Sequence, residues 1–358
     1  MKTDELVALL DTDDSLFLLD VREPDEVAEW SIPGVVNIPV GSLEKRIADV
    51  PADRRVISIC AKGGRALRAA EILAEHHIAS EVLEGGMSSW ASTYDTVSAD
   101  MGGATVIQLR RRGKGCLSYV IGAGERAIVI DPSLQIENYQ RIAAEHGWKI
   151  TFVVDTHLHA DHISGARALS AATGAQLLLS PSDPFTYDFT PLSDGLSLDL
   201  TSEVGLTVSA VAVPGHTEGS TMYQLGDACV FTGDTLFLES VGRPDLAEQA
   251  ESFAKNLYHS LHDRILLLPD ETLVFPAHYG EVVDVVAGEF VARPLGDLRA
   301  SLPALALSES EFIAWAIAHV KDRPPNYQQI VRINAGTEPV SADAAEMELG
   351  PNRCAIAS

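Results

Sequence analysis

The sequence predicts two domains of different classes, an α/β domain with a parallel sheet followed by an α+β domain. In the first hundred residues, short apolar strands alternate with helical stretches, which is the pattern of a parallel sheet. Beyond residue 104, apolar strands follow one another with glycine turns between them, as in antiparallel hairpins. We expect the domains at 1–98 and 104–337. We also expect a flexible tail at 338–358, because its end is small, acidic and free of motifs.

The composition limits the kinds of partner and the compartment. A formal net charge of −25 repels phosphate backbones and anionic lipid heads, so neither nucleic acid nor a membrane surface is expected as a partner. No run reaches the ~18 apolar residues of a membrane span, and the first residues lack the apolar core of a signal peptide. The four cysteines lack paired spacing, which suits a reducing compartment. We therefore expect a cytoplasmic protein, and the composition is compatible with a homo-oligomer.

The hydrophobic runs give the expected elements of each domain. In the first domain we expect strands at 16–22, 55–59 and 80–83 and helices that start at 23–27 and at 66. In the second domain we expect strands at 105–109, 116–122, 127–132, 150–154 and 206–213, and strand-and-turn segments at 228–235 and 272–280. A helix should begin at Ser308, which forms a capping box with Glu311. Cys116 and Cys229 fall within strands and are expected to be packed thiols.

Cys60 is the candidate nucleophile of the first domain. It ends the strand at 55–59 and leads through Lys62, Gly63 and Gly64 into the start of a helix. Backbone N–H groups there, together with Lys62 and Arg65, would stabilise a thiolate or wrap an anionic sulfur species. The alternative interpretation is a structural cysteine that precedes a helix cap.

The second domain carries a dense group of candidate metal ligands. The strand at 150–154 runs into the sequence Thr-His-Leu-His-Ala-Asp-His, which supplies His157, His159, Asp161 and His162. Three later strands each end in one further candidate, and these are His216, Asp234 and His278. Such a set can hold two zinc ions that activate a water for hydrolysis. It can equally hold one iron through two histidines and one carboxylate, with positions left open for substrate and dioxygen.

Residues 1–95 resemble the single-domain rhodaneses. The resemblance rests on four motifs in order, which are Leu-Asp-Val-Arg-Glu-Pro from residue 19, Ile-Pro-Gly from 32, Cys-x-x-Gly-x-Arg from 60 and Glu-Gly-Gly-Met-x-x-Trp from 84. It implies that Cys60 carries a persulfide, that the loop with Lys62, Gly63 and Gly64 cradles it, and that Arg65 helps to bind the sulfur donor. Asp20 and Arg22 are expected to be structural partners.

Residues 104–290 resemble the metallo-β-lactamase superfamily, through the order H-x-H-x-D-H, His, Asp, His, and the resemblance implies an αββα sandwich. Finer features, the segments at 156–165, 242–246 and 324–334, look like those of bacterial persulfide dioxygenases. That resemblance implies one Fe(II) held by His157, His216 and Asp234. The groups expected to orient these ligands are His159, Asp161, His162 and His278. Arg243 is expected near the substrate's carboxylate or phosphate, or in a structural ion pair.

Taken together, these resemblances imply a fused sulfurtransferase and persulfide dioxygenase. Cys60 would pass sulfane sulfur between a donor such as thiosulfate and a thiol. The iron centre would use O2 to oxidise a low-molecular-weight thiol persulfide, such as glutathione persulfide, to sulfite and thiol. The alternative is a glyoxalase-II-like thioester hydrolase with two zinc ions, in which the rhodanese domain is non-catalytic or regulatory.

Overall fold

The structure is a computed structural model that describes residues 1–10, 12–13, 15–201, 205–244, 249–280, 283, 285–320, 326–341 and 344–350. The chain divides into two compact units. Unit 1 is built mainly from Met1–Asp95, and the described residues 110–115 and 348–350 belong to it as well. Unit 2 is built mainly from Cys116–Met347, together with Thr96–Leu109. The chain therefore passes between the units more often than the single linker expected near residue 100.

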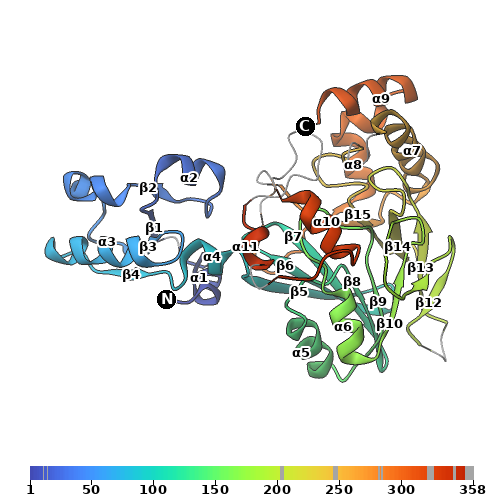
Figure 1. Ribbon diagram of the computed structural model, residues 1–358, viewed down its shortest axis with the longest axis horizontal. Helices are drawn as coiled ribbons and strands as arrows, with labels where there is room; N and C mark the ends of the chain where they lie inside the picture. The colour runs from blue at the N-terminus through green and yellow to red at the C-terminus, as the bar shows by residue number, and fades with distance from the viewer. Residues whose placement is uncertain are drawn as a thin grey trace. The chain divides into compact units, whose positions relative to one another are not determined.

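Unit 1 is organised around a four-stranded parallel sheet with the order β2-β1-β3-β4 (Figure 1). Its strands are β1 (Leu16–Asp20), β2 (Val36–Asn37), β3 (Arg55–Ile59) and β4 (Ser80–Val82). Its helices are α1 (Thr3–Leu10), α2 (Pro24–Glu29), the 3-10 helix η1 (Val40–Asp49), α3 (Gly64–Glu75) and α4 (Gly86–Trp90). Parallel strands need crossover connections, and these helices supply them. The predicted α/β class of the first domain is confirmed.

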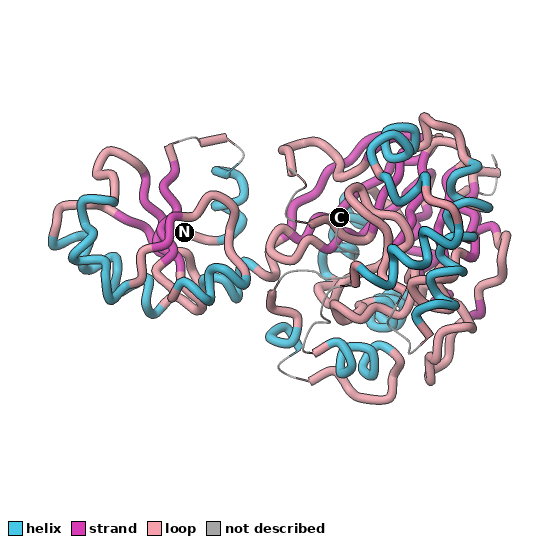
Figure 2. The backbone as a smooth tube through the Cα atoms, turned by 90° about the horizontal axis from the view of Figure 1, so that it is seen from above, coloured by secondary structure: helices cyan, strands magenta, loops and turns pink. Residues whose placement is uncertain are grey.

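The core of unit 1 lies on both faces of this sheet, and all five residues of β1 are buried. One apolar cluster includes Leu19 and Leu73, and another includes Leu18 and Trp90. Figure 2 shows the strands of this unit surrounded by helices. At the end of β1, the guanidinium of Arg22 lies 2.7 Å from Oδ2 of Asp20, and both side chains are buried. The expected structural partnership of these two residues is therefore present.

Unit 2 contains two sheets that face each other. The seven-stranded sheet has the order β11-β10-β9-β8-β7-β6-β5, and the six-stranded sheet has the order β12-β13-β14-β15-β16-β17. The strands of the first are β5 (Tyr94–Met101), β6 (Ala104–Arg111), β7 (Cys116–Ala123), β8 (Arg126–Ile130), β9 (Lys149–Val154), β10 (Gln176–Leu179) and β11 (Thr190–Pro191). Those of the second are β12 (Ser197–Asp199), β13 (Thr207–Ala212), β14 (Thr221–Leu225), β15 (Cys229–Gly233), β16 (Leu273–Pro276) and β17 (Arg293–Pro294).

Helices cover the outer faces of the two sheets (Figure 1). Helices α5 (Glu137–Glu145) and α6 (Ala166–Thr173) pack on the seven-stranded sheet. Helices α7 (Ala250–Asp263), α8 (Leu295–Ser301) and α9 (Glu309–Ala318) pack with the six-stranded sheet, as do η2 (Ile265–Leu267) and η3 (Pro303–Ala306). Two more helices, α10 (Tyr327–Asn334) and α11 (Ala344–Met347), follow near the C-terminus. The predicted αββα sandwich is confirmed.

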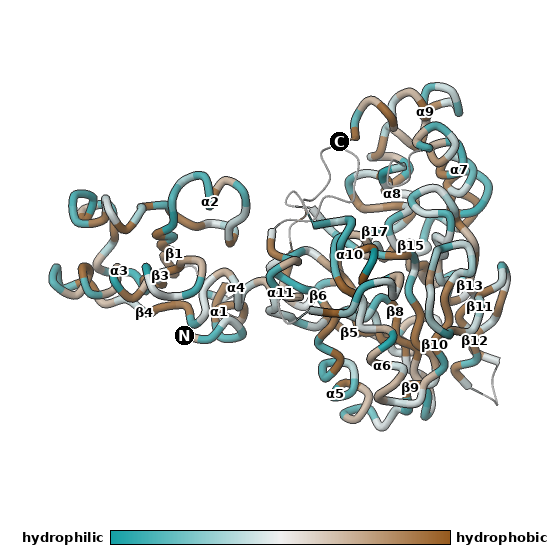
Figure 3. Tube along the Cα trace, in the orientation of Figure 1, coloured by the Kyte–Doolittle hydropathy of each residue, from teal (hydrophilic) through white to brown (hydrophobic). Residues whose placement is uncertain are grey.

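The core of unit 2 fills the space between its sheets, where Figure 3 shows apolar residues concentrated along the strands. The rings of Tyr119 and Phe231 have centroids 4.7 Å apart, and those of Phe231 and Phe275 are 5.3 Å apart. The predicted capping box of α9 is present, because Ser308 and Glu311 bond reciprocally across the first turn. Among the described residues, no helix is long and apolar enough to cross a membrane.

Two sequence expectations differ from the structure. The stretch around residues 92–103 has the composition of a polar linker, but it contains the edge strand β5, in which only Val97 is buried. An edge strand can be polar on both faces, so it lacks the hydrophobic alternation that reveals other strands. Within the expected flexible tail, α11 forms and Glu348 is 2% exposed and ion-paired to Arg111. Residues 351–358, including Cys354, lie outside the described residues.

Candidate metal centre and candidate sulfur-carrying cysteine

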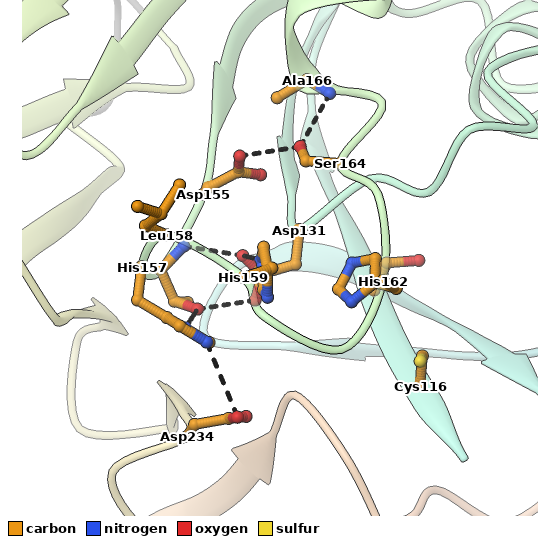
Figure 4. A network of polar contacts seen from close by, with 12 residues as sticks. Cys116, Asp131, Asp155, His157, Leu158, His159, His162, Ser164, Ala166 and Asp234 are labelled. Atoms are coloured by element: carbon orange, nitrogen blue, oxygen red, sulfur yellow. Dashed lines mark hydrogen bonds and ion pairs between the residues drawn. The ribbon is translucent and has the colours of Figure 1, made fainter. Parts of the chain in front are cut away.

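The metal-ligand candidates lie on loops at the ends of strands. The loop after β9, here called the metal loop (residues 156–164), carries four of them. His216, Asp234 and His278 follow β13, β15 and β16, which all run in the same direction within the six-stranded sheet. Loops that follow such strands leave the same edge of a sheet, so side chains distant in sequence converge. Figure 4 shows the metal loop, with Asp234 facing His157.

Three of these side chains form a compact group, which we call the triad, made of His157, His216 and Asp234. Oδ2 of Asp234 lies 3.6 Å from Nε2 of His157 and 3.4 Å from Nε2 of His216. All three residues are buried, at 3%, 0% and 2% exposure. None of these three atoms has a hydrogen-bond partner among the described residues. Buried polar atoms rarely lack a partner, so three that converge on one point indicate a ligand between them.

The other polar atom of each triad residue is held by a neighbour. Nδ1 of His157 lies 2.9 Å from the hydroxyl of Thr156, and Nδ1 of His216 donates to the carbonyl oxygen of Arg243 at 3.0 Å. A carbonyl only accepts, so His216 carries its proton on Nδ1 and presents a lone pair on Nε2. Oδ1 of Asp234 accepts from Nδ1 of His278 at 2.7 Å, which leaves Oδ2 for the triad. Such partners fix the ring orientation of metal-ligating histidines in proteins.

The triad has the protonation state that a metal requires. Burial, followed by the neighbouring His159, lowers the pKa of His157 well below its ordinary value, and burial also lowers the pKa of His216. Burial alone would raise the pKa of Asp234, but His278 and His157 outweigh it and lower this pKa. The triad therefore offers two neutral imidazoles and one carboxylate to a metal ion. Ligands about 2.1 Å from a shared first-row metal lie roughly 3.4 Å apart at tetrahedral angles, which suits the observed spacings. The residues fit one metal ion.

A second group of polar side chains lies beside the triad and consists of Cys116, Asp161, His162 and His278, all buried. Its atoms contact one another. Oδ1 of Asp161 lies 3.1 Å from Nδ1 of His162, and Oδ2 lies 2.8 Å from Nε2 of His278. Burial alone would lower the pKa of His278, but Asp161 and Asp234 raise it well above the ordinary value. The carboxylate of Asp161 is therefore engaged at both oxygens by protein groups.

Cys116 belongs to this second group, which the sequence did not indicate. Its Sγ lies 3.6 Å from Oδ2 of Asp161, so it does not have the purely apolar surroundings expected of a packed thiol. The backbone of Cys116 forms an isolated antiparallel bridge with His278, which brings the start of β7 beside the loop that follows β16. That pairing joins residues far apart in the chain, so no local pattern could have shown it. Cys229 is fully buried as expected, and burial raises its pKa to about 12.

Asp131 organises the beginning of the metal loop. One of its oxygens accepts from the backbone N–H of Thr156 at 2.6 Å and lies 3.1 Å from Nε2 of His159, and the other accepts from the Thr156 hydroxyl at 2.9 Å. Its backbone has φ of 52°, a left-handed conformation that few residues other than glycine adopt. Nδ1 of His159 has no hydrogen-bond partner among the described residues. Asp131 ends an apolar strand, which is the signal that identified Asp234 and could have identified it too.

Asp183 joins the metal loop to the loop that carries His216. Its Oδ2 accepts from the N–H of Leu158 at 2.9 Å and from the hydroxyl of Thr217 at 3.1 Å, and its Oδ1 accepts from the N–H of Gly219 at 2.9 Å. No sequence pattern indicates Asp183, because it lies in an irregular segment with no ligand motif. Arg243 is 2% exposed, and its backbone carbonyl supports His216.

Cys60 lies at the start of α3, where backbone groups surround its sulfur. Its Sγ accepts from the N–H of Gly63 at 3.1 Å and from the N–H of Ala66 at 3.4 Å, and the residue is 1% exposed. The carbonyl of Cys60 accepts from the N–H of Met87 at 2.9 Å. A Cβ on Gly86 would lie 2.0 Å from that carbonyl oxygen, and φ is 57° there. The Gly-Gly-Met motif therefore keeps the loop of Cys60 in place, and only glycine fits.

Lys62 and Gly64 are exposed on the loop that follows Cys60, while Gly63 is buried and caps α3 with φ of 100°. Arg65 forms a two-armed ion pair with Glu26, at 2.5 and 2.7 Å. This pairing lowers the pKa of Glu26 to about 2. Of the predicted loop residues, Gly63 contacts the sulfur of Cys60, and Arg65 has a partner in Glu26 that the sequence did not indicate.

Comparisons with known proteins agree with this division of the chain. Residues 2–93 match the Rhodanese-like domain, and residues 111–278 match the Metallo-beta-lactamase superfamily. The persulfide dioxygenase ETHE1 of Bos taurus is 34% identical over 208 residues, which cover 56% of this chain and 76% of that protein. The human protein of the same name is 34% identical over 203 residues, 55% of this chain and 74% of its own. A hydroxyacylglutathione hydrolase of Pseudomonas entomophila is 32% identical over 159 residues, 44% and 58% of the two chains.

A solved structure shows the same likeness. The crystal structure of ETHE1 from Myxococcus xanthus superposes with a TM-score of 0.57 at 31% identity, covering 64% of this chain and 97% of that one. The fold and the converging loop residues define a protein of the metallo-beta-lactamase superfamily that carries a rhodanese-like domain at its N-terminal side. Within that superfamily, the chain belongs to the family of the ETHE1 persulfide dioxygenases.

Proposed function

We propose that unit 2 oxidises a low-molecular-weight thiol persulfide to sulfite and the free thiol, with O2 and one Fe(II) per chain. The overall reaction is balanced as RSSH + O2 + H2O → RSH + H2SO3. The kinship with proteins named persulfide dioxygenase supports this substrate class. Glutathione persulfide or a related compound is the proposed substrate, and the residues proposed to hold iron are those of the triad.

One observation carries the choice of a single metal ion. The partnerless buried atoms of the triad are Nε2 of His157, Nε2 of His216 and Oδ2 of Asp234. In the neighbouring group, by contrast, both oxygens of Asp161 already contact histidines. A second ion there would have to separate Asp161 from these histidines, and Nε2 of His278, which also lacks a hydrogen bond among the described residues, already lies 2.8 Å from Oδ2 of Asp161. The three triad atoms make no hydrogen bond within the described part of the chain that an ion would break. Two histidines and one carboxylate are also the ligand set of many mononuclear non-haem iron oxygenases.

Each residue of the centre has a definite task in this proposal. When bound, the iron supplies coordination positions at which substrate and dioxygen can meet. Thr156 and the carbonyl of Arg243 hold the two imidazoles of the triad so that their Nε2 lone pairs face inward. His278 occupies one oxygen of Asp234, which restricts this carboxylate to binding through the other. The burial of all these groups keeps bulk water away from the reacting persulfide.

We propose that unit 1 transfers sulfane sulfur through Cys60. The thiolate attacks the outer sulfur of thiosulfate or a similar donor, the S–S bond breaks, and sulfite leaves with its electron pair. A thiol then takes the outer sulfur from the Cys60 persulfide, which regenerates the thiolate. The N–H groups of Gly63 and Ala66 are placed to stabilise the anionic sulfur. A reducing compartment, for which we propose the cytoplasm, keeps this thiol available.

The ligand assignment is tested by alanine substitution. His157→Ala, His216→Ala and Asp234→Ala should each abolish oxygen uptake with a persulfide substrate and should lose most of the iron, because a centre with two remaining ligands holds the metal weakly. His259→Ala is the matched control, since this histidine lies on the surface of α7 with 46% of its side chain exposed. Near-normal iron content and turnover in any of the three variants would show that this residue is not a ligand.

The sulfurtransferase assignment is tested with Cys60→Ser. This variant should lose transfer from thiosulfate to a thiol, because a serine hydroxyl cannot form a persulfide. It should oxidise a pre-made thiol persulfide at nearly the parent rate, since the triad lies in a unit with its own core. Strong loss of oxidation in a normally folded variant would instead mean that sulfur reaches the metal through Cys60 itself.

A thioester hydrolase with two zinc ions is the second candidate, and the second group of side chains favours it. Cys116, Asp161, His162 and His278 lie close enough to hold an ion of their own. The relative named hydroxyacylglutathione hydrolase is 32% identical over 159 residues, which cover 58% of its length. Hydrolysis of a glutathione thioester by the zinc-loaded protein, with no oxygen uptake by the iron-loaded protein, would favour this candidate over the dioxygenase.

A further inference from the structure

The side chain of Asn334, the last residue of α10, forms hydrogen bonds to the backbone of the metal loop. Its Nδ2 donates to the carbonyl oxygens of His159 at 2.9 Å and of His162 at 2.8 Å. Its Oδ1 accepts from the N–H of Ser164 at 2.9 Å. One amide thus satisfies three backbone groups that lie 170 to 175 residues earlier in the chain, and Asn334 is 7% exposed. Backbone groups of a buried loop need such partners, because no strand or helix pairs them.

The position of Asn334 is itself fixed by contacts at the end of α10. The carbonyl of Asn334 accepts from the hydroxyl of Tyr187 at 3.0 Å. The carbonyl of Ala335 accepts from both the N–H and the hydroxyl of Thr186, at 2.9 and 2.8 Å. A Cβ on Gly336 would lie 2.5 Å from the ring of Tyr187, and φ is 82° there, so this close approach requires glycine. These contacts with Thr186 and Tyr187 therefore fix the position of the Asn334 amide beside the metal loop.

Hydrogen bonds of His159 connect the backbone held by Asn334 to the triad. His159, whose carbonyl Asn334 holds, lies with Nε2 3.1 Å from Asp131. Asp131 accepts from the hydroxyl of Thr156, and that hydroxyl lies 2.9 Å from Nδ1 of His157. At the other end of the loop, the hydroxyl of Ser164 donates to Asp155 at 2.7 Å and accepts from the N–H of Ala166 (Figure 4). These contacts link the backbone that Asn334 holds to Nδ1 of His157.

We propose that Asn334 is a positioning residue of the metal centre, which fixes the backbone of residues 159–164 and thereby the direction in which His157 offers its Nε2 lone pair. The inference rests on the proposed function, because it takes the triad to be the metal site. Asn334 contacts neither metal nor substrate. Its effect is on the affinity and geometry of the metal site, and partners of this kind change metal affinity by roughly 10- to 100-fold.

The test compares two substitutions of Asn334 with a control on the same helix. Asn334→Asp retains an acceptor for Ser164 but cannot donate to the two carbonyls, and Asn334→Ala removes all three bonds. Ile330→Val is the control, because Ile330 is 1% exposed and packs in the same apolar cluster as Ile163 of the metal loop, but its side chain cannot hydrogen-bond to the loop carbonyls. Each full-length protein is stripped of metal and titrated with Co(II), whose visible spectrum reports ligand geometry. Thermal unfolding of the same samples shows how much each change loosens α10.

Both Asn334 variants should bind Co(II) at least about tenfold more weakly than the parent and show altered visible bands. Ile330→Val should lower the unfolding temperature and leave Co(II) affinity and spectrum unchanged. Parent-like Co(II) binding in both Asn334 variants would overturn the proposal, whatever their unfolding temperatures. Equal weakening in Ile330→Val would overturn it too, because the effect would then come from helix docking. A parent protein that takes up no Co(II) would overturn the metal centre itself, and the two failures are thus distinguishable.

Discussion

Asp183→Asn should weaken both the fold of unit 2 and its metal site. The carboxylate receives three hydrogen bonds, one from the residue between His157 and His159 and two from the turn after His216. The asparagine amide offers one accepting oxygen, and its NH2 group would face an N–H that needs an acceptor. A hydrogen bond to a charged group contributes about 1.5–3 kcal/mol. Burial raises the pKa of Asp183, so the neutral amide recovers part of this loss. We expect a net loss of about 2 kcal/mol.

For a unit of this size, that loss corresponds to an unfolding temperature lower by about 4–8 °C. Iron or Co(II) affinity should fall about tenfold, because fewer hydrogen bonds then join the two loops that carry the triad histidines. Calorimetry and metal titration of the purified variant measure both effects. Asp188→Asn, an exposed position in the same segment, is the matched control. An Asp183→Asn protein with unchanged unfolding temperature and metal affinity would refute the role assigned to this carboxylate.

Three further predictions concern side chains close to the triad or to Cys60. Asp161→Asn and His162→Ala should reduce oxygen uptake or iron content without removing the metal, because they support the triad from outside. Complete metal loss in either variant would count against the single-ion centre. His159→Ala should likewise retain measurable iron, since Nε2 of His159 contacts Asp131. Loss of all iron in this variant would indicate that Nδ1 of His159 binds the metal. Glu26→Gln should release Arg65 from its ion pair and thereby lower the KM for thiosulfate. The free energy of unfolding should change by less than about 1 kcal/mol, because a third of each side chain in this pair is exposed. An unchanged KM would show that Arg65 does not bind the donor.

The sequence predicts the elements that are buried, and with them most of the site. The strands around the candidate ligands show long apolar runs, so the pattern of residues alone places His216, Asp234 and His278 at strand ends. The motif around Cys60 is equally informative, because a strand that enters a glycine-containing helix start has few alternatives. The edge strand β5 escapes prediction, since its exposed faces carry polar residues.

The supports of the site could not be predicted, because they depend on contacts between distant segments. Asp183 and Asn334 are ordinary polar residues in their local context, and their functions depend on the loops that they join. Cys116 reaches the second group through a backbone bridge to a residue 162 positions away. A single sequence shows the type of each residue and its local periodicity. Some backbone groups of a loop need a hydrogen-bond partner from a distant segment, and a single sequence does not show which groups these are.

The central claim is that the metal site of unit 2 holds one iron ion in the triad. Metal analysis of anaerobically purified, full-length protein tests it most directly, combined with oxygen uptake on a thiol persulfide. We expect about one iron per chain, and loss of both iron and oxygen uptake in Asp234→Ala. Two zinc ions per chain, with hydrolysis of a thioester and no oxygen uptake after iron loading, would contradict it.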